Sequence, residues 1–155
     1  MHHSLMSSLE LKIPPPVVIG LACVFNWLMT DFFSILFQPS YVLIMALVVI
    51  AGIFGVSGVL GCVRNQTTVH PWNPKETNFL VTDGIFRFSR NPMYLGLIAL
   101  LTAYYCYQPI MVSPIGLLFV VWFLTRFQII PEERILSQKF GESYLSYTQR
   151  VRRWL

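Results

Sequence analysis

The residues best suited to chemistry lie where a polar segment meets an apolar one, between Arg87 and Gly96. Pro92 is suited to the first position of a helix, where its missing N–H costs nothing. The start of that helix would offer unpaired N–H groups and a positive dipole end, which favour a carboxylate or a phosphate. Gly96, one turn later, would let a ligand or another backbone approach closely. Arg87 and Arg90 could equally bind lipid phosphates, so spacing alone favours neither interpretation.

A second group of polar residues follows the last apolar stretch of the sequence. Glu132 and Glu133 come directly after Pro131, at the expected start of a helix. Carboxylates in this position usually stabilise the helix dipole. These two would emerge at a membrane surface, where anionic lipid does not favour acidic groups. The basic cluster from Arg150 to Arg153 is either a lipid anchor or a clamp for an anionic substrate.

The composition indicates the environment in which these segments work. Of the 155 residues, 55% are hydrophobic and 12% are charged, whereas an ordinary soluble domain has about 25% charged residues. A soluble chain of this length could not bury so much apolar surface. The composition therefore excludes a water-soluble monomer, a disordered chain and a nucleic-acid-binding protein with a solvated basic patch.

Four apolar stretches predict an all-α integral membrane protein with about four transmembrane helices. They cover residues 17–37, 41–63, 93–107 and 110–125. The first two are long enough to cross a hydrocarbon core about 30 Å thick. The last two are separated by Gln108 and Pro109 alone, which predicts a tight helical hairpin.

The remaining segments complete the expected architecture. The long connection from Arg64 to Asn91 is predicted to be a cytoplasmic loop. Beyond Arg126, apolar residues recur every three or four positions, which predicts an amphipathic helical segment broken at Gly141. We expect one domain over residues 1–155, in which a helical pair (1–63) precedes the loop, hairpin and tail (64–155).

Basic residues predict the orientation in the membrane. They are concentrated in the connection between the second and third stretches and in the tail, and the two short connections contain none. By the positive-inside rule, both termini and both polar segments are expected on the cytoplasmic side. Asp31 lies near the other end of the first stretch and is expected to be exposed at the far interface.

Two parts of the sequence resemble the isoprenylcysteine carboxyl methyltransferase family, which is related to the membrane phospholipid methyltransferases. The first part matches the cofactor signature of that family at Asn78, Leu80, Val81, Thr82, Gly84, Phe86, Arg90, Asn91, Pro92, Tyr94 and Gly96. The second part matches at Glu132, Glu133, Leu136, Phe140, Gly141, Tyr144, Tyr147, Val151 and Arg153. Order and spacing agree from about residue 65 to the C-terminus.

The resemblance implies a membrane enzyme that uses S-adenosylmethionine without a soluble Rossmann-type domain. It places the cofactor between the loop, the first turn of the hairpin and the acidic pair. Apolar residues of the loop would line the adenosyl pocket, and Glu132 would hold a ribose hydroxyl or the amino group. The implied cofactor-binding residues are Asn78, Phe79, Leu80, Val81, Phe86, Asn91, Pro92, Met93, Tyr94 and Glu132. The three cysteines form no metal-binding pattern, and no metal site is expected.

The acceptor site departs from the family pattern. A basic residue that contacts the acceptor carboxylate in the eukaryotic enzymes falls at Gln128 here, and either Arg126 or Arg153 could replace it. We expect a lipophilic acceptor that enters from the membrane lipid: a prenylcysteine-like carboxylate, a lipid amine or another small membrane-soluble molecule. A carboxylate needs no general base, whereas an amine or a thiol does, and the candidates for that base are Glu133 and Tyr94.

Two other functions fit parts of the same pattern. A reductase related to the sterol reductases would bind NADPH, whose phosphates require several convergent arginines, and Arg87, Arg90 and Arg126 are the candidates. A non-catalytic scaffold would pack the second stretch on a partner through small residues. The small residues in question are Gly52, Gly55, Gly58 and Gly61, for which packing within the chain is the expected role.

Overall fold

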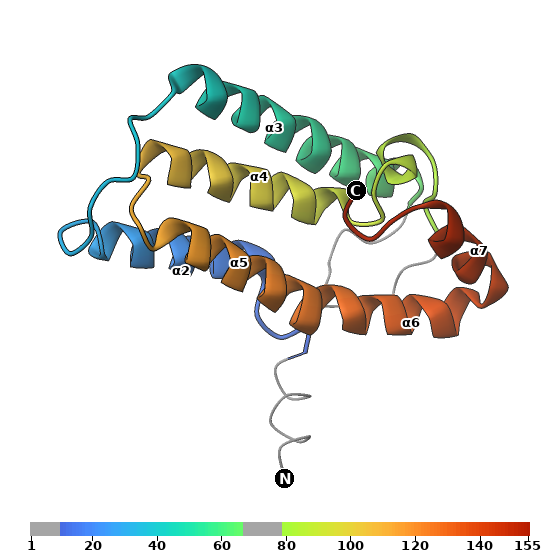
Figure 1. Ribbon diagram of the computed structural model, residues 1–155. Coiled ribbons are helices and arrows are strands. Elements are labelled where there is room, and N and C mark those ends of the chain that lie inside the picture. Colours follow the sequence, from blue (N-terminus) through green and yellow to red (C-terminus); the bar gives the residue numbers. More distant parts are fainter. Residues whose placement is uncertain (1–9, 67–78) are drawn as a thin grey trace, which may run out of the picture.

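Helices form the architecture of the computed structural model, which describes residues 10–66 and 79–155 (Figure 1). Within these ranges the extended backbone pairing is confined to an isolated bridge between Ile35 and Ile110. The elements are α2 (Pro15–Leu28), α3 (Tyr41–Arg64), the 3₁₀ helix η2 (Gly84–Arg87), α4 (Pro92–Tyr107), α5 (Ser113–Leu124), the π-helical segment η3 (Thr125–Ile129), α6 (Ile130–Phe140) and α7 (Glu142–Arg150).

Two continuous helices are long and apolar enough to cross a membrane. They are Tyr41–Arg64 and Ser113–Phe140, and the second combines α5, η3 and α6. The other two apolar helices, α2 and α4, are shorter. The all-helical fold is therefore as expected, with two candidate membrane-spanning helices among the described residues, and four crossings remain a prediction.

The first apolar stretch differs from its prediction as one helix over residues 17–37, because α2 ends at Leu28. The backbone beyond this point pairs with the connection between α4 and α5 instead of continuing the helix. The N–H of Leu36 donates to the carbonyl of Pro109 at 2.7 Å, and the N–H of Met111 donates to that of Ser34 at 3.2 Å. Hydropathy could not reveal this pairing, because it joins segments far apart in the sequence.

The segment after the fourth stretch also differs from its prediction, which was a helix that starts at Pro131. No new helix starts at Pro131, because α5 continues through η3 into α6. A proline inside a helix lacks its N–H and crowds the carbonyl four residues before it, here that of Phe127. The wider π turn lies directly ahead of the proline, and the Phe127 carbonyl accepts a hydrogen bond from the N–H of Leu11 at 2.9 Å. The expected break at Gly141 is present, where φ is +51°.

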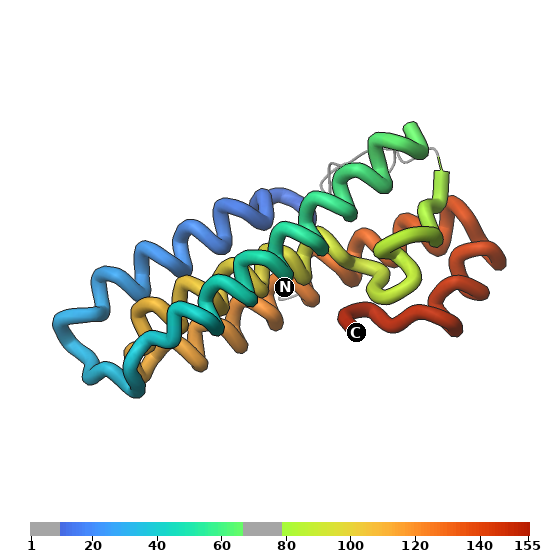
Figure 2. Tube along the Cα trace, turned by 90° about the horizontal axis from the view of Figure 1, so that it is seen from above, coloured from blue at the N-terminus to red at the C-terminus, as the bar shows by residue number. Residues whose placement is uncertain are grey.

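Helices α3 and α4 lie side by side along their length (Figures 1 and 2). The backbone of α3 lies close to Gly96, where a Cβ atom would lie 2.8 Å from the backbone nitrogen of Gly55. Gly58 faces Met93 in the same way, and Gly61 faces Phe86. Gly58 and Gly61 therefore serve packing within the chain, as expected, whereas a Cβ atom at Gly52 or Gly55 would meet nothing within 4 Å.

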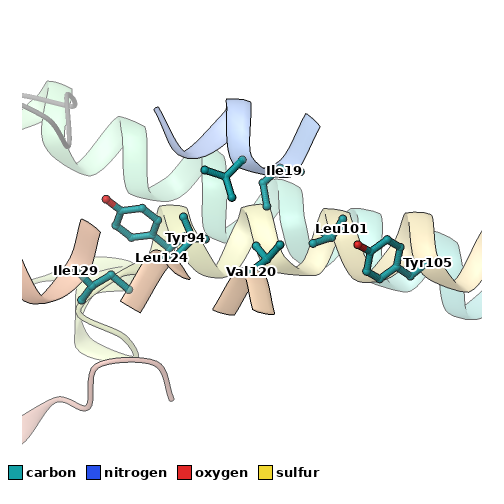
Figure 3. Packing of buried hydrophobic residues seen from close by; sticks show 8 residues of the cluster. Ile19, Tyr94, Leu101, Tyr105, Val120, Leu124 and Ile129 are labelled. Carbon is teal, nitrogen blue, oxygen red and sulfur yellow. The ribbon is translucent and has the colours of Figure 1, made fainter. Parts of the chain in front are cut away.

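The main hydrophobic core is formed where α2 and α5 also pack on α4 (Figure 3). Its buried residues are Val18, Ile19, Tyr94, Leu101, Tyr105, Val120, Leu124 and Ile129. Many large apolar side chains remain exposed on the outer helix faces, among them Leu21, Trp27, Val42, Val56, Leu118 and Trp122. A soluble monomer rarely exposes so much continuous apolar surface, so these faces are suited to contact with lipid.

Candidate active site

One end of the helical bundle brings together the two polar segments identified in the sequence. The beginning of α4, the helix α7 and the C-terminus all lie at this end (Figure 1). The connection between α4 and α5 lies at the opposite end (Figures 1 and 2). Residues that precede α4 and residues that follow α5 therefore meet in space.

The contact between Tyr94 and Glu132 joins the two halves of the motif. Tyr94 is in the first turn of α4 and is buried, and Glu132 is in the first turn of α6 and is partly buried. The Tyr94 hydroxyl donates a hydrogen bond to Glu132 Oε2 at 3.2 Å. A tyrosine hydroxyl and a carboxylate are thus held together beside the main core.

Glu133 is the centre of an ion-pair cluster that consists of Arg90, Glu133 and Arg153. Arg90 Nη1 lies 3.1 Å from Glu133 Oε1. Arg153 binds the same carboxylate through two nitrogens, with Nε at 3.1 Å and Nη2 at 2.7 Å. The hydrogen bonds to Glu133 raise the pKa of the Arg153 guanidinium above its ordinary value. This carboxylate, a candidate base by sequence, is fully engaged by two guanidinium groups.

The C-terminal segment is also held by its backbone. The carbonyl of Arg153 accepts hydrogen bonds from Asn91 Nδ2 at 2.9 Å and from Ser89 Oγ at 3.3 Å. The N–H of Arg90 donates to the carbonyl of Arg152 at 3.1 Å. Asn91 therefore fixes the tail, and its side chain makes no capping bond to α4. Sequence reasoning missed Ser89, whose only signal is a small polar residue beside Arg90.

The expected adenosyl-pocket residues fall into three groups. Val81 and Phe86 are buried with Cys62, and Met93 packs against them. Leu80 packs instead with the tail cluster of Tyr144, Tyr147 and Val151. Phe79 is exposed, and Asn78 lies outside the described residues.

The loop cluster and the tail cluster are linked through the backbone. The Tyr147 hydroxyl donates to the carbonyl of Phe86 at 2.7 Å. Burial, followed by the nearby Glu133 charge, raises the pKa of Tyr144 to about 12. Burial also raises the pKa of Tyr147, so both tail tyrosines keep their protons to a higher pH than an ordinary tyrosine does.

The residues expected to bind the acceptor are not brought together. Arg126 Nη1 pairs with Glu10 Oε1 at 2.9 Å, whereas Arg153 pairs with Glu133. Gln128 is fully buried, and its Nε2 donates to the carbonyl of Ile13 at 2.8 Å.

Sequence reasoning missed Glu10 as a contact of this site. Its signal in the sequence is slight: it is the sole acidic residue ahead of the first apolar stretch. Among the described residues, no group of His, Cys, Asp and Glu side chains could hold a metal ion.

Comparison with known proteins identifies the family. Protein-S-isoprenylcysteine O-methyltransferases B and A of Arabidopsis thaliana are each 29% identical to this chain over 109 residues, or 69% of the chain. The match covers 54% of each of them, so the chain spans about half their length. An uncharacterized protein of Haemophilus influenzae is 38% identical over 63 residues, which are 41% of this chain and 100% of that protein. No solved structure gave a significant match.

The family model for phospholipid methyltransferases matches residues 39–143, a segment that contains Tyr94, Glu132 and Glu133. This segment is more than half of the chain. The protein therefore belongs to the phospholipid methyltransferase family.

Proposed function

We propose that this protein is an integral membrane methyltransferase that transfers a methyl group from S-adenosylmethionine to a lipophilic acceptor. Membership of the family and the exposed apolar helix faces support this proposal. The observation that carries it is the hydrogen bond of 3.2 Å between Tyr94 and Glu132. This contact joins the first turn of α4 to the acidic pair, which are the two parts of the chain that the family resemblance assigns to one cofactor site.

The residues at this end of the bundle fit the groups of S-adenosylmethionine. Glu132 offers an anion for the ammonium group or a ribose hydroxyl. Arg90 Nε is buried and has no hydrogen-bond partner among the described residues, so it is a donor suited to the cofactor carboxylate. Val81, Phe86 and Met93 supply apolar surface for the adenine ring. Asn91 and Pro92 set the position of the helix start between these groups.

The protein contributes chiefly position and exclusion of water to this reaction. The bound cofactor supplies a methyl group already activated by its sulfonium. Holding the acceptor in line with that methyl group lowers the barrier by removing translational and rotational freedom in advance. We assign Glu133 a positioning role, because two guanidinium groups engage its carboxylate. For an amine or thiol acceptor, Tyr94 could accept the proton while it passes its own proton to Glu132.

The ion pairs of the site bear on the nature of the acceptor. The Arabidopsis relatives carry names that specify isoprenylcysteine. A carboxylate acceptor of that kind would have to displace Glu10 from Arg126 or Glu133 from Arg153. Gln128 offers no positive charge. An uncharged or amine-bearing lipophilic acceptor meets no such competition, and we propose that class.

The reductase alternative receives less support from the geometry. NADPH would require Arg87, Arg90 and Arg126 to converge, but Arg90 and Arg126 are paired with different carboxylates. We further propose that the chain crosses the membrane four times, with the site and both termini on the cytoplasmic side. The basic residues at the site end support this orientation.

Cofactor binding by purified protein in detergent tests the proposed function. Wild-type protein should bind S-adenosylmethionine in a calorimetric titration, and Glu132→Ala should weaken binding at least about ten-fold by removing a charged hydrogen-bond acceptor. Glu142→Gln is the matched control, because Glu142 is an exposed carboxylate at the same end of the molecule. Membranes that contain the protein should also transfer a labelled methyl group to a lipid-phase product. The proposal fails if wild-type protein does not bind, or if Glu132→Ala binds equally well.

A further inference from the structure

The segment ahead of α2 crosses the π-helical segment η3 and is here called the N-terminal strap (residues 10–13). Two backbone groups of the strap form hydrogen bonds with successive residues of η3. The N–H of Leu11 donates to the Phe127 carbonyl at 2.9 Å, and the Ile13 carbonyl accepts from Gln128 Nε2 at 2.8 Å. The strap is therefore docked on the helix by specific polar contacts.

A pair of salt bridges reinforces this docking. Glu10 Oε1 lies 2.9 Å from Arg126 Nη1, and Glu10 Oε2 lies 3.4 Å from Arg134 Nη1. The Glu10 side chain is only 16% exposed, so solvent screens its charge less than that of a surface carboxylate. Each of three successive residues, from 126 to 128, thus has a partner in the strap.

The helix needs these partners because of Pro131. The proline has no N–H to give to the Phe127 carbonyl, and the Leu11 N–H takes that place. Leu11 has a φ of 59°, a conformation that is unfavourable for residues with a Cβ atom. Leu11 in the docked strap therefore keeps an unfavourable backbone conformation, and its N–H donates to the Phe127 carbonyl, which Pro131 leaves without a partner inside the helix.

The residues that the strap contacts lie close to Tyr94 and Glu132, the hydrogen-bonded pair on which the proposed function rests. Gln128 lies four residues ahead of Glu132 in the continuous helix formed by η3 and α6, which is about one helical turn. Ile13 packs against the core cluster that contains Tyr94. The strap thus contacts the core cluster that contains Tyr94 and also Gln128, which precedes Glu132 in the same helix.

We propose that the N-terminal strap is a working part of the cofactor site, with Glu10 as a positioning residue that fixes η3 and so places Glu132. This inference rests on the proposed function. The strap lies outside the segment 39–143 that matches the family model. If docking of the strap places Glu132, then binding of the cofactor must stabilise docking by the same coupling free energy.

Two measurements on the full chain in detergent test this coupling. In calorimetry, Glu10→Gln should weaken binding of S-adenosylmethionine about five- to ten-fold, which is within the usual range of coupling between sites. Glu10→Asp should restore part of the affinity, and the control Glu142→Gln should leave it unchanged. In hydrogen exchange of wild-type protein, S-adenosylmethionine should slow exchange at the Leu11 amide, which is remote from the proposed cofactor contacts in the sequence.

The outcomes separate this inference from the proposed function. If wild-type protein binds the cofactor but exchange in residues 10–13 does not change, the positioning role of the strap is wrong and the proposed function stands. Equal affinity of Glu10→Gln and wild type would contradict the positioning role in the same way. If wild-type protein does not bind the cofactor, both proposals fall together. The exchange measurement needs no substitution, so it decides the question even if Glu10→Gln fails to fold.

Discussion

Buried and partly buried polar side chains hold both ends of α4, but the chemical groups at the two ends differ. At the end near the α4–α5 connection they are neutral amides and hydroxyls, whereas at the site end they are charged. We call the neutral group the amide cluster, which consists of Asn26, Tyr104, Gln108 and Ser113. The charged group is the ion-pair cluster of Arg90, Glu133 and Arg153.

The amide cluster is satisfied within the chain. Asn26 Nδ2 donates to the Gln108 carbonyl at 3.2 Å, and Ser113 Oγ donates to Asn26 Oδ1 at 2.8 Å. The Tyr104 hydroxyl lies 3.0 Å from Gln108 Oε1. No buried side-chain atom of this cluster lacks a hydrogen-bond partner. The cluster therefore has all the contacts that it needs to fasten α2 to α4 and α5.

The site end is incomplete by the same measure. The two buried side-chain atoms without a partner in the described part of the chain, Arg90 Nε and Gln128 Oε1, both lie there. An unpaired buried polar atom costs stability, and a ligand, an ion or an ordered water can supply the missing partner. The two ends of α4 therefore differ: the amide cluster is complete within the chain, whereas the site end keeps polar atoms to which a ligand can bind.

The largest effect is expected from Glu133→Gln, which leaves two guanidinium groups without their carboxylate. Breaking a buried ion pair from one side costs about 3 kcal/mol. The variant should unfold at much lower denaturant concentration, measured by circular dichroism in detergent, and should bind S-adenosylmethionine at least about ten-fold more weakly. Glu142→Gln is again the control. Wild-type stability in Glu133→Gln would show that the ion-pair cluster does not hold this end together.

Asn26→Leu should cost about 2 kcal/mol of unfolding free energy, because it removes a buried hydrogen-bonding side chain and leaves Ser113 with fewer partners. The double variant Asn26→Leu/Ser113→Ala should recover part of that loss, since it removes both partners. Cofactor affinity of the folded protein should not change in either variant. A change in the affinity for S-adenosylmethionine, measured by calorimetry, would show that the amide cluster also contributes to cofactor binding, and it would contradict the distinction between the two ends of α4.

The sequence predicted those features of the fold that depend on local chemistry. The second and third apolar stretches form α3 and α4, as predicted. Helix α6 ends at Gly141, because glycine can adopt the positive φ that is found there. The end of α2 at Leu28 could not be predicted, since it depends on pairing between residues 34–36 and 109–111. The continuity of η3 depends likewise on the distant N–H of Leu11.

The candidate site, like the fold, could be predicted only in part. The resemblance to the family implied that Tyr94 and Glu132 belong to one cofactor site, and the two side chains are hydrogen-bonded, while their binding of a cofactor stays a prediction. The sequence could not show that Glu133 forms ion pairs with two arginines, or that Glu10 forms an ion pair with Arg126. Partners of long charged side chains are chosen by tertiary structure, so a list of charged residues leaves the pairing open.

The smallest effect at neutral pH is expected from Tyr144→Phe, and it should grow at alkaline pH. Burial, followed by the charge of Glu133, raises the pKa of Tyr144 from 10.0 to about 12. Between these values the unfolded chain releases the proton while the folded protein keeps it, so stability falls as pH rises. Wild-type protein should therefore lose up to about 2 kcal/mol between pH 10 and pH 12 that Tyr144→Phe does not lose.

Alkaline titrations of unfolding by circular dichroism, run in parallel on the two proteins, measure this difference. The effect reports first on the burial of Tyr144 and second on the charge of Glu133. Parallel loss of stability in both proteins would show that neither burial nor Glu133 raises the pKa of the Tyr144 hydroxyl. It would also weaken the contrast between the two ends, because the charges at the site end would then act only on each other.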